Sequence, residues 1–172
     1  MDDILKGKRV LIVDDEPDIL ETLSEMLEMC FTDTAPNFET AQKFLSKNDY
    51  DVAIFDIMGV KGYDLLKLAN KKGIPALMLT AHALSPENLV RSIKGGARSY
   101  VPKDKISEIT TFLAEILESR DKGIEKEGTW FARLKPFFDK KFGTEWREEH
   151  KEFWQDFDKT YRVSKDEIEK II

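Results

Sequence analysis

The chain has 172 residues and a formal net charge of −6, and 41% of its residues are hydrophobic and 35% charged, which is typical of soluble globular proteins. No run approaches the roughly 20 apolar residues of a membrane span, and Met1-Asp2-Asp3-Ile4 lacks the basic and apolar regions of a signal peptide. The single cysteine, Cys30, excludes an internal disulfide. These features predict a cytoplasmic protein with one full domain and an appendage.

Short apolar runs alternate with segments of helical spacing over the first two thirds of the chain. After each expected strand, apolar residues recur at helical intervals, and Asn37 and Ser85 stand where helix caps belong. This alternation predicts a doubly wound parallel sheet, because strands that alternate with helices form that α/β class of fold. The expected strands are residues 8–13, 31–35, 52–56, 76–80 and 99–101.

Asp56 ends the most apolar of these strands, Val52-Ala53-Ile54-Phe55-Asp56. Open α/β sheets place their ligands at the carboxyl ends of the strands. A carboxylate there can act as a metal ligand, a base or a nucleophile, or it can simply cap the next helix.

Polar residues also follow three other strands, namely Asp14-Asp15, Thr80 and Lys103. Three carboxylates close together repel one another unless a cation lies among them. Mg²⁺ prefers carboxylates, waters and phosphate oxygens, and a lysine and a hydroxyl can hold phosphoryl oxygens. The set predicts phosphoryl transfer to a carboxylate, with Asp56 as the nucleophile and Lys103 and Thr80 holding the phosphoryl group.

Over residues 7 to about 118, the chain resembles the receiver domains of two-component response regulators. Four stretches carry the resemblance: Val10-Leu11-Ile12-Val13-Asp14-Asp15-Glu16, Ile54-Phe55-Asp56-Ile57-Met58, Met78-Leu79-Thr80-Ala81 and Gly96-Ala97-Arg98-Ser99-Tyr100-Val101-Pro102-Lys103. The resemblance implies a five-stranded, flavodoxin-like sheet of order 2-1-3-4-5 in a receiver domain of residues 1–120. It also implies a histidine kinase or a phosphotransfer protein as the partner that supplies the phosphoryl group.

The same resemblance assigns roles to the strand-end residues. Asp56 would be the phosphoacceptor, and Asp14, Asp15, Asp56 and the backbone carbonyl of Met58 would bind Mg²⁺. Thr80 and Tyr100 would be a switch pair. Thr80 is drawn toward the phosphoryl group and Tyr100 turns inward, which reshapes the face formed by the fourth helix, the fifth strand and the fifth helix. The domain would be the substrate of this transfer, so we do not expect an enzyme.

The sequence departs from the family pattern at two places. Val60 stands where the family usually has a proline, and Gly62 follows Asp56 by six residues where the family's glycine follows by eight, which predicts a shorter loop beside the site. Asp104 follows Lys103 where the family often has a proline in a cis bond. We expect a trans Lys103–Asp104 bond, because a cis bond without proline costs about 3 kcal/mol.

Residues 121–172 form an extension of a different character. Residues 121–128 are charged and contain glycine, so we expect a linker or a helix break. Beyond it, Thr129 could cap a helix that Pro136 ends early or kinks. A second helix would place on one largely aromatic stripe Trp146, His150, Phe153, Trp154, Phe157 and Tyr161. A capping box at Ser164 would start a third helix. So small an extension can barely bury such a face alone, so we expect it to pack on the receiver, on a second copy or on a partner.

Several functions are compatible with this organisation. We favour a phosphorylation-dependent switch with the extension serving dimerisation or protein binding. A DNA-binding regulator with a helix-turn-helix in residues 121–172 is the alternative, although residues 119–172 carry 13 basic and 13 acidic residues rather than a basic surplus. An aspartate-based phosphatase usually has a second acid two residues after its nucleophile, where this chain has Met58. A pseudo-receiver, which is a receiver domain that is not phosphorylated, would lack some of the catalytic residues. In this chain each of those positions holds the residue type that the family uses.

Overall fold

The computed structural model describes residues 2–123 and 128–160. Five parallel strands form one sheet in the order β2-β1-β3-β4-β5, so the predicted fold class and strand order are confirmed. The strands are β1 (Arg9–Val13), β2 (Phe31–Ala35), β3 (Val52–Asp56), β4 (Ala76–Thr80) and β5 (Ser99–Pro102).

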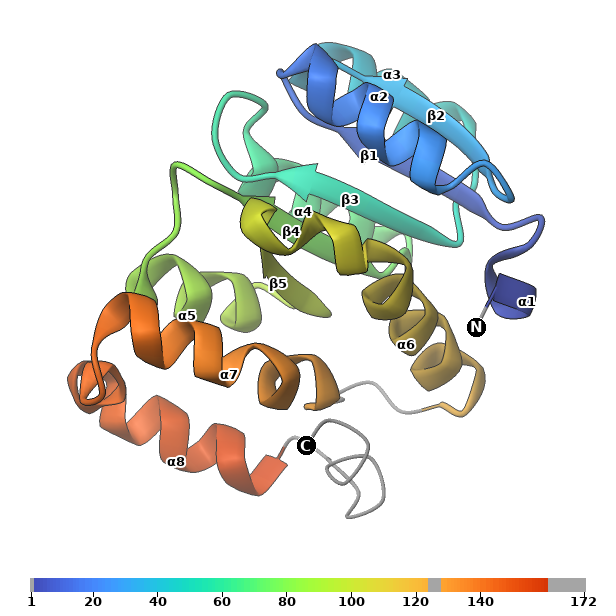
Figure 1. Ribbon diagram of the computed structural model, residues 1–172. Coiled ribbons are helices and arrows are strands. Elements are labelled where there is room, and N and C mark those ends of the chain that lie inside the picture. The colour runs from blue at the N-terminus through green and yellow to red at the C-terminus, as the bar shows by residue number, and fades with distance from the viewer. Residues whose placement is uncertain (1, 124–127, 161–172) are drawn as a thin grey trace.

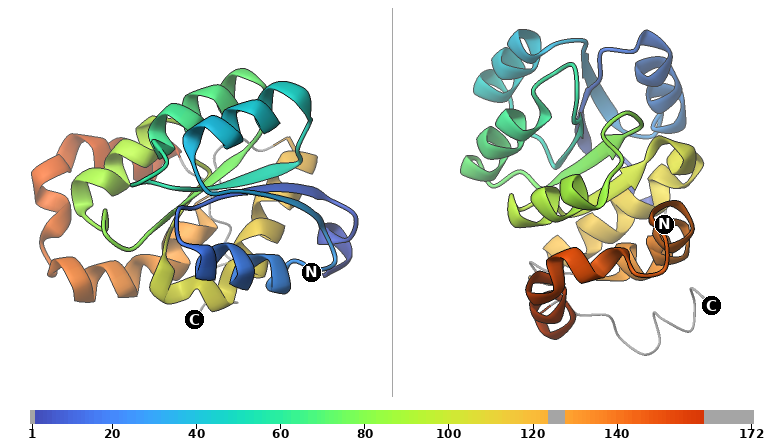
Figure 2. Two further views of the ribbon diagram at one scale, coloured as in Figure 1. Left: turned by 90° about the horizontal axis from the view of Figure 1, so that it is seen from above. Right: turned by 90° about the vertical axis from the view of Figure 1, so that its left-hand side faces the viewer.

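Helices cover both faces of the sheet (Figures 1 and 2). On one face lie α2 (Pro17–Met26) and α6 (Ile109–Asp121), and on the other lie α3 (Phe38–Lys47), α4 (Gly62–Lys71) and α5 (Pro86–Lys94). Every residue of β3 and β4 is buried, as expected for the central strands of a parallel sheet that is covered on both sides. Asn37 and Ser85 cap α3 and α5 by accepting hydrogen bonds from the backbone N–H groups of Thr40 and Asn88, as predicted.

Two local features were not predicted from the sequence. A short helix, α1 (Asp2–Leu5), packs against α6 and buries Leu5 completely. The chain also forms a 3₁₀ segment, η1 (Lys103–Glu108), before α6 begins. The peptide bond between Lys103 and Asp104 is trans, as expected.

The extension forms a hairpin of α7 (Thr129–Phe142), the 3₁₀ segment η2 (Trp146–His150) and α8 (Lys151–Thr160), which we call the C-terminal hairpin. One expectation was wrong here, because Gly128, not Thr129, precedes the first helical residue. Of the two outcomes expected at Pro136, an early end is excluded, since α7 continues through it. Pro136 is exposed. Tyr161 and the capping box at Ser164 lie outside the described residues.

The C-terminal hairpin packs on the receiver domain. α7 packs against β5 and α6, η2 packs against α5, and α8 lies beside α7 (Figures 1 and 2). The buried aromatic residues of the hairpin belong to the same continuous hydrophobic core as the sheet. Of the three packing partners that we expected, the structure therefore shows the receiver itself. Among the described helices, none combines the length and the apolar character needed to cross a bilayer.

Candidate phosphoacceptor site

The sheet brings the polar strand ends to one edge. Asp14 follows the last residue of β1, Asp56 and Thr80 end β3 and β4, and Lys103 follows β5. Val13 pairs with Phe55 in the parallel register, so Asp14 and Asp56 leave neighbouring strands at the same level. Asp14, Asp56 and Thr80 are all buried, with 1%, 6% and 1% of their surfaces exposed.

Lys103 holds the centre of this site. Its Nζ lies 3.0 Å from Asp14 Oδ2, 3.1 Å from Glu16 Oε1 and 3.6 Å from Asp56 Oδ1. Burial by itself would lower the pKa of Lys103, but the hydrogen bonds to Asp14 and Glu16 and the charge of Asp56 raise it instead. Lys103 is therefore a fixed positive charge beside Asp56.

Burial raises the pKa of Asp56 to about 7, and the negative charge of Asp14 adds to this effect while Lys103 opposes it. Burial also raises the pKa of Asp14, although the backbone N–H of Glu16 and the Lys103 ammonium oppose that rise. Both shifts arise mainly from burial, and for Asp56 the neighbouring carboxylates add to it.

The chemistry of these side chains fits a bound Mg²⁺. Carboxylate oxygens of Asp14, Asp15 and Glu16 lie within 4.8 Å of one another, and hard oxygen ligands of this kind are those that Mg²⁺ binds. A divalent cation here would offset the negative charges of the neighbouring carboxylates, which add to the effect of burial on the pKa of Asp56. The side chain of Met58 is 55% exposed, and the role of its carbonyl as a metal ligand stays a prediction.

The loop after Asp56 passes close to two acidic residues. Gly59 has a φ of +88°, and a Cβ on it would lie 2.4 Å from Asp15 Oδ2. Lys61 adopts the left-handed conformation, and a Cβ on Gly62 would lie 2.2 Å from the Asp56 carbonyl oxygen. Two glycines thus let the backbone pass close to both acidic residues.

The two residues of the expected switch pair are linked through the loop between β4 and α5. Thr80 Oγ1 accepts a hydrogen bond of 3.0 Å from the Ala83 N–H. The Tyr100 hydroxyl donates to the Ala83 carbonyl at 2.9 Å and accepts from the Ser85 N–H at 3.2 Å. Tyr100 is completely buried, and burial raises the pKa of its hydroxyl.

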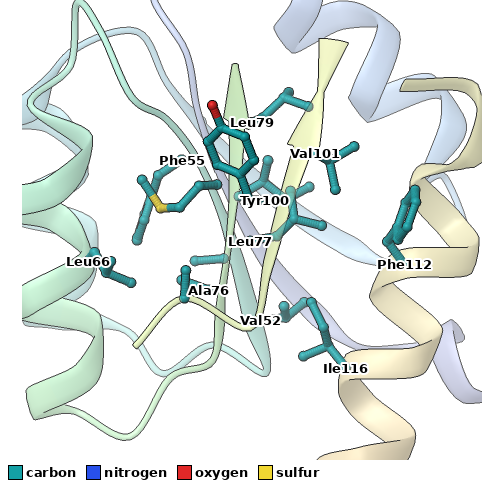
Figure 3. Packing of buried hydrophobic residues seen from close by; sticks show 14 of the residues in the cluster. Val52, Phe55, Leu66, Ala76, Leu77, Leu79, Tyr100, Val101, Phe112 and Ile116 are labelled. Atoms are coloured by element: carbon teal, nitrogen blue, oxygen red, sulfur yellow. The ribbon is translucent and has the colours of Figure 1, made fainter. Parts of the chain in front are cut away.

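Figure 3 shows how Tyr100 lies in the core. Tyr100 and Val101 are neighbours on β5 but point to opposite sides of the sheet, as successive strand residues do. Val101 faces Phe112 and Ile116 of α6, whereas the Tyr100 ring lies on the side of Phe55 and Leu66. The tyrosine therefore already points inward in this structure.

Sequence reasoning missed the role of Glu16. It was part of the motif after the first strand, but no function was assigned to it. In the structure its half-exposed carboxylate is a direct partner of Lys103. A third consecutive acidic residue at a strand end was the available signal.

A second group of possible metal ligands lies where α5 meets η2. Glu87, Glu149 and His150 place one ligand atom each within 4.8 Å of one another, and all three are exposed or half-exposed. Local sequence spacing does not indicate this group of ligands, because Glu87 comes from the receiver domain and lies beside His150 only in the folded protein.

Comparison with known proteins agrees with this site. Residues 10–114 match the family model described as the response regulator receiver domain. The heme response regulator HssR of Staphylococcus aureus strain Newman is 40% identical over 99 residues, which cover 54% of this chain and 43% of HssR. The chain thus spans less than half the length of the curated relatives that it matches.

Solved receiver domains also share the fold. A CheY-like receiver domain protein from Methanospirillum hungatei JF-1 is 30% identical with a TM-score of 0.59, covering 69% of this chain and 99% of that one. The Francisella response regulator 1452 receiver domain is 29% identical with a TM-score of 0.58, covering 67% and 99%. The non-phosphorylated HemR receiver domain of Leptospira biflexa is 30% identical with a TM-score of 0.57, covering 64% and 94%.

The family match ends at residue 114, before the C-terminal hairpin begins. The matched stretch contains β2 to β5, all of β1 except its first residue, and the strand-end residues Asp14, Asp56, Thr80 and Lys103. With sequence, fold and relatives in agreement, this chain belongs to the family of response regulator receiver domains of two-component systems.

Proposed function

We propose that this chain is a phosphorylation-dependent switch that accepts a phosphoryl group on Asp56 from a histidine kinase or a phosphotransfer protein. The observation that carries the proposal is the position of Asp56. Its carboxylate is nearly buried at the end of β3, lies 3.6 Å from Lys103 and is close enough to Asp14 and Asp15 for their charges to raise its pKa.

The proposed reaction is a single phosphoryl transfer. An Asp56 carboxylate oxygen forms a bond to phosphorus while the bond between phosphorus and the donor histidine nitrogen breaks, and the imidazole leaves with the electron pair of that bond. Bound Mg²⁺, held by Asp14, Asp15 and Asp56, would offset the negative charge that the incoming phosphoryl group adds.

The chain's own residues perform the positioning. Lys103 already lies beside Asp56, so its ammonium can pair with a phosphoryl oxygen after giving up part of its contact with Asp14 and Glu16. The Thr80 hydroxyl accepts a hydrogen bond from the Ala83 N–H, so its own hydrogen can be donated to a second phosphoryl oxygen. In this proposal the domain is a substrate that is modified once per cycle and not an enzyme. We also propose that it is located in the cytoplasm.

Phosphorylation with a small-molecule donor tests the acceptor. The unmodified chain, Asp56→Asn and Asp49→Asn are incubated with acetyl phosphate, with Mg²⁺ or with EDTA, and phosphate incorporation is measured by intact-mass spectrometry. Asp49 is a fully exposed aspartate and serves as the control. We expect one phosphoryl group on the unmodified chain and on Asp49→Asn with Mg²⁺ only, and none on Asp56→Asn. Normal incorporation by Asp56→Asn would refute the assignment.

A further inference from the structure

The C-terminal hairpin covers the receiver face that surrounds Tyr100. α7 contacts β5 and α6, and η2 contacts α5. Arg133 of α7 pairs with Glu115 of α6, with 2.9 Å between Arg133 Nε and the carboxylate. Lys94 of α5 lies over the ring of Phe153 in α8 at 5.6 Å. The hairpin is therefore anchored to all three elements of this face.

Phe138 carries the hairpin's contact with the switch tyrosine. Its ring centroid lies 6.0 Å from that of Tyr100, and both rings are completely buried. Phe138 also contacts the rings of Phe131, Phe142 and Trp146 within the hairpin. Because interiors are close-packed, Tyr100 cannot leave its position without disturbing the aromatic core of the hairpin.

A continuous set of contacts links this pair to the acceptor edge of the sheet. The Tyr100 hydroxyl is bonded to the backbone of Ala83 and Ser85, and the Ala83 N–H is bonded to the hydroxyl of Thr80. Thr80 is the last residue of β4, the strand beside the one that ends in Asp56. Tyr100, on which the hairpin packs, and Thr80 at the acceptor edge thus both contact the loop between β4 and α5.

We propose that the C-terminal hairpin is a built-in ligand of the switching face, which holds Tyr100 inward and thereby favours phosphorylation of Asp56. This inference rests on the proposed function. The family resemblance implies that phosphorylation turns the tyrosine inward, and here the tyrosine is inward with Phe138 packed on it. Two ligands that favour the same conformation strengthen each other, and the coupling is reciprocal.

Docking of the hairpin could either favour or oppose phosphorylation of Asp56, and the position of Tyr100 favours the first. A hairpin that inhibited the switch would have to fit best to an outward tyrosine, whereas Phe138 packs on a tyrosine whose hydroxyl has two bonds inside the loop. A second copy of the chain cannot reach this face without displacing the hairpin, so we assign the face to the hairpin of the same chain.

Beryllofluoride, a stable mimic of the phosphoryl group, tests the coupling on the full chain. Its affinity in the presence of Mg²⁺ is measured by isothermal titration calorimetry for the unmodified chain, Phe138→Ala, the milder Phe138→Leu and Phe137→Ala. Phe137 is the neighbouring control. Its half-buried ring lies by Lys105 and Lys141 and contacts the edge of the Phe138 ring, whereas the ring that packs on Tyr100 is that of Phe138. We expect an affinity about fivefold weaker for Phe138→Ala, a smaller loss for Phe138→Leu and no change for Phe137→Ala.

Hydrogen exchange of the Ser85 amide provides a readout without any phosphoryl mimic. This N–H donates to the Tyr100 hydroxyl, so its protection should fall about fivefold in Phe138→Ala and stay constant in Phe137→Ala. The fluorescence of Trp130, Trp146 and Trp154, which all lie in the hairpin, shows whether each variant keeps the hairpin folded.

The possible results separate the two proposals. If beryllofluoride does not bind the unmodified chain, the proposed function fails and the coupling fails with it. If it binds the unmodified chain and Phe138→Ala equally well, the function stands and the coupling is overturned. Tighter binding to Phe138→Ala would also overturn the inference, because it would make the hairpin an inhibitor.

Discussion

The ammonium of Lys103 lies 3.6 Å from the carboxylate of Asp56 and closer still, at 3.0 Å, to Asp14. The lysine thus pairs most closely with the expected metal-binding aspartate and only more loosely with the expected acceptor. Binding of a cation to Asp14 would weaken this first pairing and free the ammonium for a phosphoryl group on Asp56.

Asp56→Asn should stabilise the metal-free protein at alkaline pH. The pKa of Asp56 is about 7 in the folded protein and 3.8 as its ordinary value. The folded state therefore binds the proton more tightly than the unfolded state does. The contribution of Asp56 to the free energy of unfolding is fully present below pH 4 and is lost as the pH rises toward 7. Above pH 7 the charged carboxylate costs at most about 4 kcal/mol.

Thermal unfolding in EDTA measures this effect. The melting temperature of Asp56→Asn should exceed that of the unmodified chain at pH 8, by less at pH 5, and by least when Mg²⁺ is added at pH 8. A gain that did not vary between pH 5 and pH 8 would show that burial and charge repulsion are not its cause.

Lys103→Ala should destabilise the protein most in EDTA. The substitution leaves the buried carboxylates of Asp14 and Asp56 without their cation, and breaking a buried ion pair costs about 3–5 kcal/mol. Urea unfolding with EDTA and with Mg²⁺ measures the loss, which Mg²⁺ should reduce. Lys67→Ala, an exposed lysine on α4, is the control and should change the unfolding free energy by less than about 0.5 kcal/mol.

The same variant should separate modification from switching. We expect acetyl phosphate to modify Asp56 in both the unmodified chain and Lys103→Ala. Phosphorylation should slow hydrogen exchange of the Ser85 amide in the unmodified chain but not in Lys103→Ala. Equal protection in both proteins would remove Lys103 from the switch.

Gly62→Ala should disrupt the loop beside the acceptor. The new Cβ would lie 2.2 Å from the Asp56 carbonyl oxygen and 2.8 Å from the Cα of Ile57, and both are backbone atoms that cannot rotate away. We expect a loss of more than about 2 kcal/mol in unfolding free energy, together with weaker Mg²⁺ binding.

Gly73→Ala is the comparison for this prediction. Gly73 has a φ of +71° but no neighbour within 4 Å of an added Cβ, so its substitution carries only the backbone penalty of about 1 kcal/mol. Chemical denaturation and Mg²⁺ titration of both variants check the difference. Equal losses would mean that the close approach at Gly62 relaxes freely.

Arg133 and Glu115 should contribute to docking of the C-terminal hairpin. Their side chains are 27% and 17% exposed, so solvent screens the ion pair only in part. A double-mutant cycle of Arg133→Ala and Glu115→Ala, followed by tryptophan fluorescence in urea, should give a coupling of about 1 kcal/mol. A coupling near zero would assign the docking to the aromatic contacts alone.

The sequence by itself determined the α/β fold and the residues at the strand ends, and its resemblance to receiver domains implied the order of the strands. Fully apolar strands such as Val52–Phe55 must be covered on both faces, and parallel strands bring Asp14, Asp56 and Lys103 to one edge whatever the details of packing. Local signals also placed the caps at Asn37 and Ser85, because a cap depends on residues within one helical turn.

Only the tertiary structure decided where the extension lies. Its aromatic pattern predicted a buried face but was equally compatible with the receiver, a second copy or a partner. The contacts of Phe138 with Tyr100 and of Arg133 with Glu115 join residues far apart in the chain, and no local spacing encodes them. Helix α7 likewise continues through Pro136, because helical stability in proteins comes mostly from tertiary packing of an amphipathic face, here the buried Phe131, Leu134 and Phe138.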